Sequence, residues 1–193
     1  MSLGNIKDSI VDSDFTEIKK EGNISLRLDL GCGNNKKEGF LGVDFSDECG
    51  ADIIHNLDIY PYPFEDSTVS EIFCSHFFEH VGSTKNFMEE CWRMLQSGGV
   101  LDIIVPYYTS LRATQDFTHK NFISENSFLY FNKNWIDQNK LQHYNIDCNF
   151  SIDNVRYFYA PEWSTRSVEA QEWARKHYWN VVLDIQVTLR AIK

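Results

Sequence analysis

The sequence predicts an α/β fold in which a doubly wound, mostly parallel seven-stranded sheet carries an antiparallel C-terminal strand pair. Short apolar segments alternate with helical segments along the chain, which is typical of parallel sheets. A glycine turn follows the first strand, and the last two strands are long enough to form an antiparallel edge pair. The expected strands are 24–30, 40–44, 51–55, 71–75, 100–106, 149–160 and 180–192, and the expected helices are 84–96 and 167–178.

The first two strands are joined by a short connection. The segment ISLRLDL (24–30) alternates and then becomes apolar before a glycine turn, and FLGVD (40–44) forms the next strand. Only eight residues separate Gly33 from Gly42, whereas a crossover with a helix usually needs ~10–12 residues. We therefore expect the helix of this crossover to be one turn long or missing.

The helix expected over 84–96 has signals at both ends. Ser83 or Thr84 can cap its N-terminus, and Gly98 and Gly99 are expected to end it before the strand VLDIIVP (100–106). Its buried stripe comprises Phe87, Cys91, Met94 and Leu95. In the last strand, alternate apolar side chains are expected to face one way, namely Val181, Leu183, Ile185, Val187 and Leu189.

Composition limits the kinds of partner. The chain of 193 residues has a formal charge of −10, which argues against a nucleic-acid backbone as the main partner. Five cysteines are dispersed without a C-x-x-C pair, which favours a reducing compartment. We find no apolar run long enough to span a bilayer and no secretory signal, so the expectation is a cytoplasmic protein. The expected organisation is an N-terminal arm (1–23) and one domain (24–193).

The stretch LDLGCGNN (28–35) indicates a nucleoside site. Its glycines let the backbone approach a ligand closely, and Asp44 closes the next strand, where a carboxylate can accept both hydroxyls of a ribose. Lys36 stands where the dinucleotide fingerprint needs its third glycine, and no GK[ST] follows. A nucleoside without phosphate remains, and S-adenosylmethionine is such a ligand.

Four motifs occur in the order found in a known family. They are LDLGCG, GVD, NLDIYPYPFEDSTVSEIFCSHFFEHV and MEECWRMLQSGGVLDIIVP, which together span residues 26–106. This chain resembles the class I S-adenosylmethionine-dependent methyltransferases of the type-11 group. The resemblance implies a Rossmann-like fold and S-adenosylmethionine as cofactor. The family often has a third glycine where this chain has Asn35, a residue type that tolerates left-handed backbone angles.

The resemblance also implies which residues hold the cofactor. Asp29 would hold the methionyl amine, Asp44 the ribose hydroxyls and Asp58 the adenine amino group, with Leu57 beside the ring. Gly31 and Gly33 would make room for the methionine moiety and the ribose, and Ser75 would lie near the methionine moiety. The full set of expected cofactor residues is Asp29, Gly31, Cys32, Gly33, Asp44, Phe45, Leu57, Asp58, Ser75 and His76.

Residues 76–80 read HFFEH, which allows a second interpretation. On a helix, His76 and His80 would share one face, as in the H-x-x-E-H motif of zinc hydrolases. The same pattern is common after the fourth strand in the type-11 group, where it implies no metal, and Gly82 limits any helix. We therefore expect cofactor-side scaffolding and no metal, with a zinc hydrolase as the less favoured alternative.

The segment after the fifth strand is where this family builds its substrate pocket, here expected as a substrate-side insertion over 107–145. Arg112, Asp116 and His119 recur at helical spacing, and Asp116 and His119 match a D-x-x-H of related chains. We expect His119 to act as general base, Asp116 to orient its ring and Arg112 to bind an anionic group. Tyr107 and Tyr108 are candidate pocket walls. The alternatives are an ion-paired loop face for the polar residues and a packed core for the aromatic ones.

These observations predict a methyltransferase that moves a methyl group from S-adenosylmethionine to a small-molecule acceptor by in-line transfer. No nucleic-acid or membrane partner is expected. The alternative from another class is a binding module that keeps the cofactor site without turnover, which the short crossover and the untested base leave open.

Overall fold

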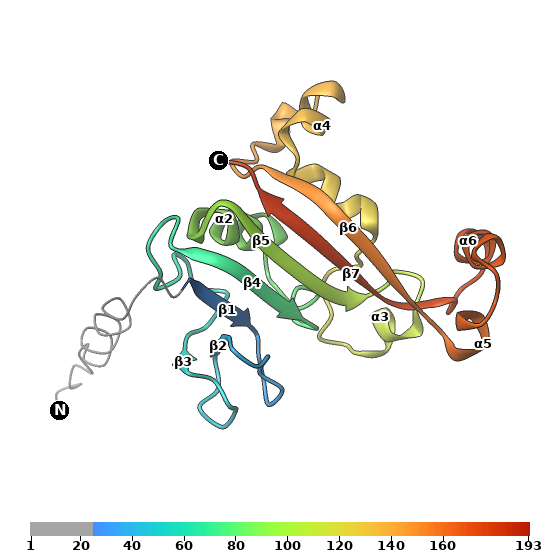
Figure 1. Cartoon of the computed structure of the whole chain (residues 1–193), viewed down its shortest axis with the longest axis horizontal. Helices are drawn as coiled ribbons and strands as arrows, with labels where there is room; N and C mark the ends of the chain where they lie inside the picture. The colour runs from blue at the N-terminus through green and yellow to red at the C-terminus, as the bar shows by residue number, and fades with distance from the viewer. Residues whose placement is uncertain (1–24) are drawn as a thin grey trace, which may run out of the picture.

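The computed structural model describes residues 25–193. The arm expected over 1–23 lies outside the described residues. The described chain forms one seven-stranded sheet in the order β3-β2-β1-β4-β5-β7-β6 (Figure 1). The strands are β1 (Leu26–Leu30), β2 (Leu41–Asp44), β3 (Ile53–Ile54), β4 (Val69–Ser75), β5 (Leu95–Pro106), β6 (Phe150–Tyr159) and β7 (Val182–Ala191).

The sheet has the predicted mixture of strand directions. Strands β1 to β5 pair in parallel, and β7 pairs antiparallel with both β5 and β6. This arrangement confirms the predicted Rossmann-like α/β fold with an antiparallel C-terminal pair. It also places the carboxyl ends of β1, β2, β4 and β5 along one edge, which is where ligands bind in open parallel sheets.

The principal helix is α2 (Thr84–Met94), which connects β4 to β5. Ser83 caps it by accepting a hydrogen bond from the backbone N–H of Asn86 at 3.2 Å. The expected helix ended at residue 96, but Leu95 is fully buried and already pairs with Val69 as the first residue of β5. Gly98 and Gly99 therefore lie within that strand instead of ending the helix.

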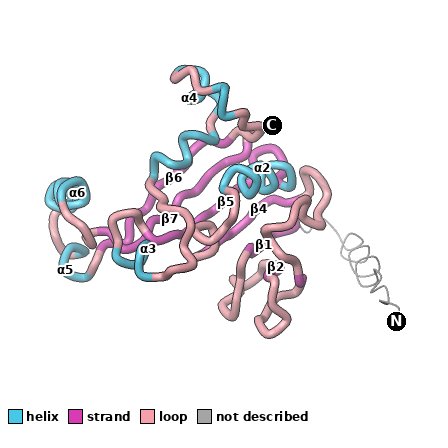
Figure 2. The backbone as a smooth tube through the Cα atoms, turned by 180° about the vertical axis from the view of Figure 1, so that it is seen from behind, coloured by secondary structure: helices cyan, strands magenta, loops and turns pink. Residues whose placement is uncertain are grey.

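The first three strand connections are loops. Between residues 25 and 83 the structure contains no helix, so the helix expected to be short or missing after β1 is missing. Figure 2 shows α2 over β4 and β5 in the view from behind. The remaining helices are α3 (Leu111–Gln115), η1 (Glu125–Phe131), α4 (Lys133–Gln138), η2 (Gln142–Tyr144), α5 (Pro161–Ser164) and α6 (Val168–His177).

The core lies on one face of the sheet. Alternate residues of β5 and β7 are fully buried there, namely Leu101, Ile103, Val105, Ile185, Val187 and Leu189. On the opposite face, Asp102 accepts hydrogen bonds from Gln186 at 2.7 Å and Thr188 at 3.0 Å. This apolar-and-polar alternation is what an antiparallel pair with one packed face produces. None of the helices in the described part of the chain is long and apolar enough to span a membrane.

Candidate functional site

Three adjoining hollows lie at the carboxyl edge of the parallel strands. We name them by what lines them: the glycine-turn hollow (about 470 Å³), the Asp58 hollow (about 230 Å³) and the His119 hollow (about 260 Å³). His76 lines both the glycine-turn and the His119 hollow, and His80 lines both the Asp58 and the His119 hollow. The three hollows therefore meet at residues 76–80.

The glycine turn after β1 requires glycine at Gly31. Its φ is +71°, and a Cβ built there would lie 2.3 Å from Cγ of Phe77. Its N–H donates to the carbonyl of Val43 at 2.8 Å, which ties the turn to β2. Gly33 also has a positive φ, of +48°, but has open space around it. Backbone strain and close approach thus both select glycine at Gly31.

The carboxylate of Asp44 is held by backbone donors. Oδ2 accepts the N–H of Gly33 at 2.9 Å, and Oδ1 accepts the N–H of Phe45 at 2.7 Å. Oδ1 also accepts a longer hydrogen bond from the N–H of Ser46, at 3.4 Å, so the lone pair that remains for a ribose hydroxyl is on Oδ2. Asp44 and Phe45 line the Asp58 hollow. Asp44, the residue predicted to bind the ribose, therefore lies at the C-terminal end of β2.

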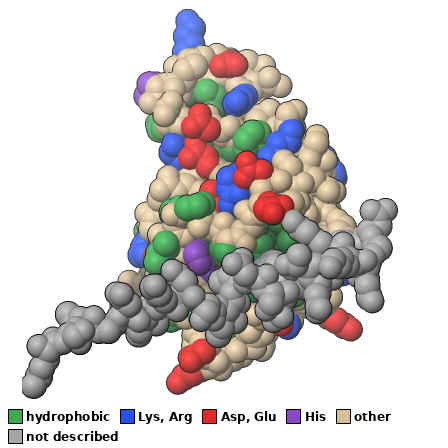
Figure 3. Space-filling model, turned by 90° about the vertical axis from the view of Figure 1, so that its left-hand side faces the viewer, with side chains coloured by type: hydrophobic (Ala, Val, Ile, Leu, Met, Phe, Trp, Pro, Cys, Tyr) green, Lys and Arg blue, Asp and Glu red, His purple; other side chains and the backbone are tan. Residues whose placement is uncertain are grey.

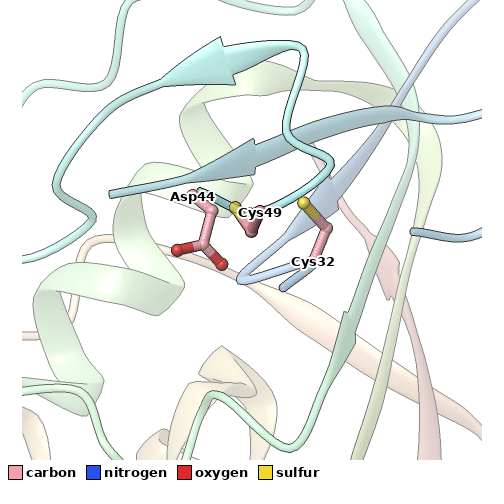
Figure 4. Close-up of side chains that lie close together, drawn as sticks. All are labelled: Cys32, Asp44 and Cys49. Carbon is pink, nitrogen blue, oxygen red and sulfur yellow. The ribbon is translucent and has the colours of Figure 1, made fainter. Parts of the chain in front are cut away.

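Two thiols stand beside Asp44. One ligand atom from each of Cys32, Asp44 and Cys49 lies within 4.8 Å of the others (Figure 4). Burial raises the pKa of the Cys32 thiol to about 12. A thiol that stays protonated at neutral pH is a poor metal ligand. We therefore interpret this group as part of the nucleoside site.

Asp29 is buried in the wall of the glycine-turn hollow. Its side chain is 2 % exposed, and Oδ2 accepts the N–H of Lys37 at 2.7 Å. Burial raises the pKa of Asp29, although the hydrogen bond from Lys37 opposes that shift. The predicted cofactor residues Gly31, Cys32, Gly33, Ser75 and His76 line the same hollow.

The Asp58 hollow gathers the residues expected beside the adenine. Leu57 is buried, and its carbonyl accepts the hydroxyl of Tyr62 at 2.8 Å, which fixes the loop after β3. Oδ1 of Asp58 accepts the N–H of Gly82 at 2.9 Å, and Oδ2 lies 3.8 Å from Nζ of Lys120. Phe45 is 73 % exposed, so a large apolar surface remains for a ring to cover.

The HFFEH stretch is not helical. His76 has a left-handed backbone with φ of +54°, and residues 78–80 form a turn. The helical zinc geometry that would put His76 and His80 on one face is therefore not formed, because the chain reverses immediately after β4. Glu79 is instead buried, with Nδ1 of His76 at 3.5 Å from Oε1.

The expected helix through Arg112, Asp116 and His119 ends early. Helix α3 stops at Gln115, and Asp116 is its C-terminal cap. Oδ1 of Asp116 accepts both the N–H and the hydroxyl of Thr118, at 2.8 and 2.7 Å, which turns the chain out of the helix. All three predicted residues nevertheless line the His119 hollow.

The imidazole of His119 is oriented by the backbone. Its Nδ1 lies 3.0 Å from the carbonyl of Ala113, whereas Oδ2 of Asp116 is 3.9 Å from Nε2, beyond hydrogen-bond range. The orienting partner is therefore Ala113, where the sequence had suggested Asp116. Hydrogen bonding from the Thr118 hydroxyl lowers the pKa of Asp116, so this carboxylate is ionised at neutral pH.

The remaining predicted substrate residues are placed differently. Nη1 of Arg112 donates to Asp184 at 2.6 Å, so an ion pair compensates much of its charge. Tyr107 and Tyr108 line a separate hollow of about 470 Å³ near Arg175, and Tyr107 is 2 % exposed. The structure therefore does not bring the two tyrosines to His119.

Sequence reasoning missed several residues that line the site. Thr118 and Lys120 flank His119 in the chain and reach the Asp58 hollow, and Gln115 reaches the His119 hollow. Asn56 precedes the expected Leu57–Asp58 pair and Phe77 follows His76. Adjacency to predicted residues was the only signal that could have found them.

Comparison with known proteins agrees with this geometry. Residues 28–103 match the family model described as a methyltransferase domain. Over these residues, which make up less than half of the chain, the sequence is similar to the methyltransferase family. The cofactor of this group is S-adenosylmethionine, and the held Asp44 carboxylate and the glycine turn fit its nucleoside and methionine parts. No curated protein matches the sequence.

Solved structures share the methyltransferase fold at low identity. A SAM-dependent methyltransferase from Archaeoglobus fulgidus is 18% identical with a TM-score of 0.60, over 91% of this chain and 90% of that one. One from Mesorhizobium loti is 15% identical with a TM-score of 0.54, over 86% and 90%. A geranyl diphosphate C-methyltransferase from Streptomyces coelicolor A3(2), solved with Mg²⁺, geranyl diphosphate and S-adenosyl-L-homocysteine, is 14% identical with a TM-score of 0.55, over 88% and 74%.

Proposed function

We propose that this chain is an active enzyme that transfers a methyl group from S-adenosylmethionine to a small-molecule acceptor. The observation that carries the proposal is the junction of the three hollows at residues 76–80. Two hollows hold the predicted cofactor residues, and the third holds His119. A donor in the first two hollows and an acceptor in the third would therefore meet beside His76.

The chain's own residues supply the cofactor seat. Asp44 would take the ribose hydroxyls, because its carboxylate is fixed in place by three backbone N–H groups. Asp29 would accept the methionyl ammonium, and Leu57 with Asp58 would hold the adenine. Backbone N–H groups hold the carboxylates of Asp29, Asp44 and Asp58 in place, which limits the ordering cost of binding.

The chemistry needs alignment and, for some acceptors, a base. The sulfonium of S-adenosylmethionine supplies an activated methyl group, so the protein mainly positions donor and nucleophile. The carbonyl of Ala113 only accepts hydrogen bonds, so Nδ1 of His119 carries the proton. The lone pair of Nε2 is then free to take a proton from a hydroxyl or amine acceptor.

Size and charge support a small acceptor. The His119 hollow measures about 260 Å³, which is close to the lower end of small-ligand pockets. Acidic and basic side chains are interspersed on the face in Figure 3, without a broad basic patch among the described side chains seen there. The fold neighbour that acts on geranyl diphosphate is one methyltransferase with a small acceptor.

A transfer assay tests the proposal. The 193-residue chain is incubated with S-adenosylmethionine labelled in the methyl group and with a cell extract split by ultrafiltration into small molecules and macromolecules. We expect label to appear in the small-molecule fraction and not in the macromolecular one. Label confined to the macromolecular fraction would contradict the small-acceptor proposal.

The competing function is a cofactor-binding module without turnover. The observation that favours it is the absence of any helix in the described connection between β1 and β2, which leaves the glycine turn less covered. Calorimetry with S-adenosylmethionine, run beside the transfer assay, separates the two functions. Binding without transfer to any fraction would favour the module.

We also assign the protein to the cytoplasm. The five cysteines are all free, and four of them, Cys32, Cys74, Cys91 and Cys148, are buried. Unpaired thiols fit a reducing compartment. Fractionation of cells that express the tagged protein tests the assignment, and recovery in an exported fraction would contradict it.

A further inference from the structure

We propose that Glu79, His80 and His119 bind one divalent transition-metal cation in the wall of the His119 hollow. One ligand atom from each residue lies within 4.8 Å of the other two. Glu79 and His80 belong to the HFFEH stretch and His119 to the D-x-x-H stretch. The fold thus joins two patterns that are separate in the sequence, and it uses only the second histidine of the first one.

Glu79 provides an independent reason to expect a cation. Its side chain is 2 % exposed, and neither carboxylate oxygen has a hydrogen bond among the described residues. Oε1 lies 3.5 Å from Nδ1 of His76 and 4.0 Å from Nε2 of His119. A buried carboxylate without hydrogen bonds is costly, and a cation between Glu79 and the imidazoles would remove that cost.

The hydrogen bonds leave the outer nitrogens of both rings available. His119 donates from Nδ1 to the Ala113 carbonyl, so its Nε2 bears a lone pair. The Thr118 hydroxyl lies 2.7 Å from Asp116 and 3.1 Å from Nδ1 of His80. Because its single hydrogen goes to the carboxylate, its oxygen accepts the Nδ1–H of His80. An imidazole pinned through one nitrogen by an oxygen acceptor is the usual state of a metal-binding histidine.

The two segments are also held at a fixed spacing. The N–H groups of Lys120 and Asn121 both donate to the carbonyl of Glu79, at 2.9 and 3.1 Å. Ligands about 2.1 Å from a tetrahedral ion are about 3.4 Å apart. The 4.0 Å between Oε1 of Glu79 and Nε2 of His119 therefore needs to shorten by about half an ångström. The other two pairs lie within 4.8 Å and need to shorten by at most about 1.4 Å, which side-chain rotation can supply.

Two imidazoles and one carboxylate select the class of ion. This set suits Zn²⁺, Fe²⁺ or Co²⁺, whereas Mg²⁺ and Ca²⁺ prefer oxygen ligands. The three ligands would leave positions open toward the hollow. Where the proposed function also holds, the cation would occupy the lone pair otherwise used for proton transfer and would polarise an acceptor oxygen or nitrogen instead.

The test uses the 193-residue chain stripped with a chelator. Zn²⁺ binding is measured by competition with a chromophoric chelator, and Co²⁺ is used as a spectroscopic probe. We expect the wild type to bind one equivalent of either metal, with a visible Co²⁺ absorption spectrum that indicates a low coordination number. Binding should be at least tenfold weaker in Glu79→Gln and His119→Ala. His143→Ala is the matched control, because His143 is exposed on η2, and it should bind like the wild type.

Three results would overturn the proposal. The first is that neither metal binds, and the second is that Glu79→Gln binds metal as tightly as the wild type. The third is a thiolate-to-cobalt charge-transfer band that disappears in Cys32→Ser, which would place the ion beside Asp44. Circular dichroism and a melting shift with S-adenosylhomocysteine verify that each variant is folded. The metal titration needs no methyl transfer, so failure of the metal site and failure of the proposed function are distinguished.

Discussion

The backbone N–H of Gly33 donates to Oδ2 of Asp44 at 2.9 Å, which links the turn after β1 to the carboxylate that ends β2. The turn and the acid are therefore one structural unit. The turn holds the carboxylate in position for a ribose, so a change in the turn or in Asp44 should weaken the binding of the cofactor's nucleoside.

Replacing Asp44 with Ala should weaken cofactor binding. The change removes charge-assisted hydrogen bonds to the ribose, so we expect a loss of more than ~1 kcal/mol, roughly fivefold in Kd. Equilibrium dialysis with labelled S-adenosylmethionine measures it. Asp47→Ala is the matched control, because Asp47 is an exposed acid on the same loop, and similar affinities for both variants would exclude Asp44 as the ribose ligand.

Replacing Gly31 with Ala should damage both fold and site. A side chain at φ of +71° is strained, and its Cβ would lie 2.3 Å from Phe77. We expect a loss of about 1–3 kcal/mol in the free energy of unfolding, measured by denaturant titration, together with loss of cofactor binding. Gly50→Ala should be nearly neutral, since nothing lies within 4 Å of that position. Wild-type stability in the Gly31 variant would refute the close approach.

Replacing His119 with Ala should lower turnover and spare cofactor affinity. His119 lines the hollow beside the two that hold the cofactor residues, and a general base contributes typically 10²–10⁴-fold. Single-turnover transfer and calorimetry with S-adenosylhomocysteine give the two quantities. A parallel loss of affinity would mean that His119 belongs to the cofactor site.

Cofactor affinity should fall in mild acid. Burial raises the pKa of Asp29 above its ordinary 3.8, so the carboxylate that would hold the methionyl ammonium is protonated at a higher pH than a typical aspartate. Binding should weaken as the pH falls toward that raised pKa. Acidification does not lower the free energy of unfolding through Asp29, because its carboxyl group binds a proton more tightly in the native state than in the unfolded chain.

Asp29→Asn provides the control for the pH effect. Its affinity should be low at neutral pH and nearly independent of pH across the same window. If the variant and the wild type lost affinity in parallel on acidification, another group would be responsible. Calorimetry at several pH values with a fixed buffer ionisation enthalpy measures the effect.

The strands were predictable because each depends on local alternation. The period of two in β7 and the apolar runs of β1 and β4 are visible in the sequence, and the structure confirms the predicted seven-stranded sheet. The short spacing between Gly33 and Gly42 likewise predicted that no full helix would follow β1. Local patterns were enough wherever one face of a strand is buried.

The acceptor side was less predictable because it depends on contacts between distant segments. The spacing of His76 and His80 left a helical zinc motif open as the less favoured alternative, and the positive φ of His76 that rules out this helix is a tertiary feature that periodicity does not reveal. Asp116 bonds to Thr118 instead of the ring of His119. The burial of Glu79 depends on the return of residues 119–121 to the turn after β4, which no local pattern encodes.

The most direct test of the central claim is a calorimetric titration of the wild-type protein with S-adenosylhomocysteine. The geometry at Gly31, Asp29 and Asp44 predicts saturable binding of one ligand per chain, accompanied by a rise in Tm. A titration without heat and without a change in Tm would contradict the cofactor seat and every role assigned beside it.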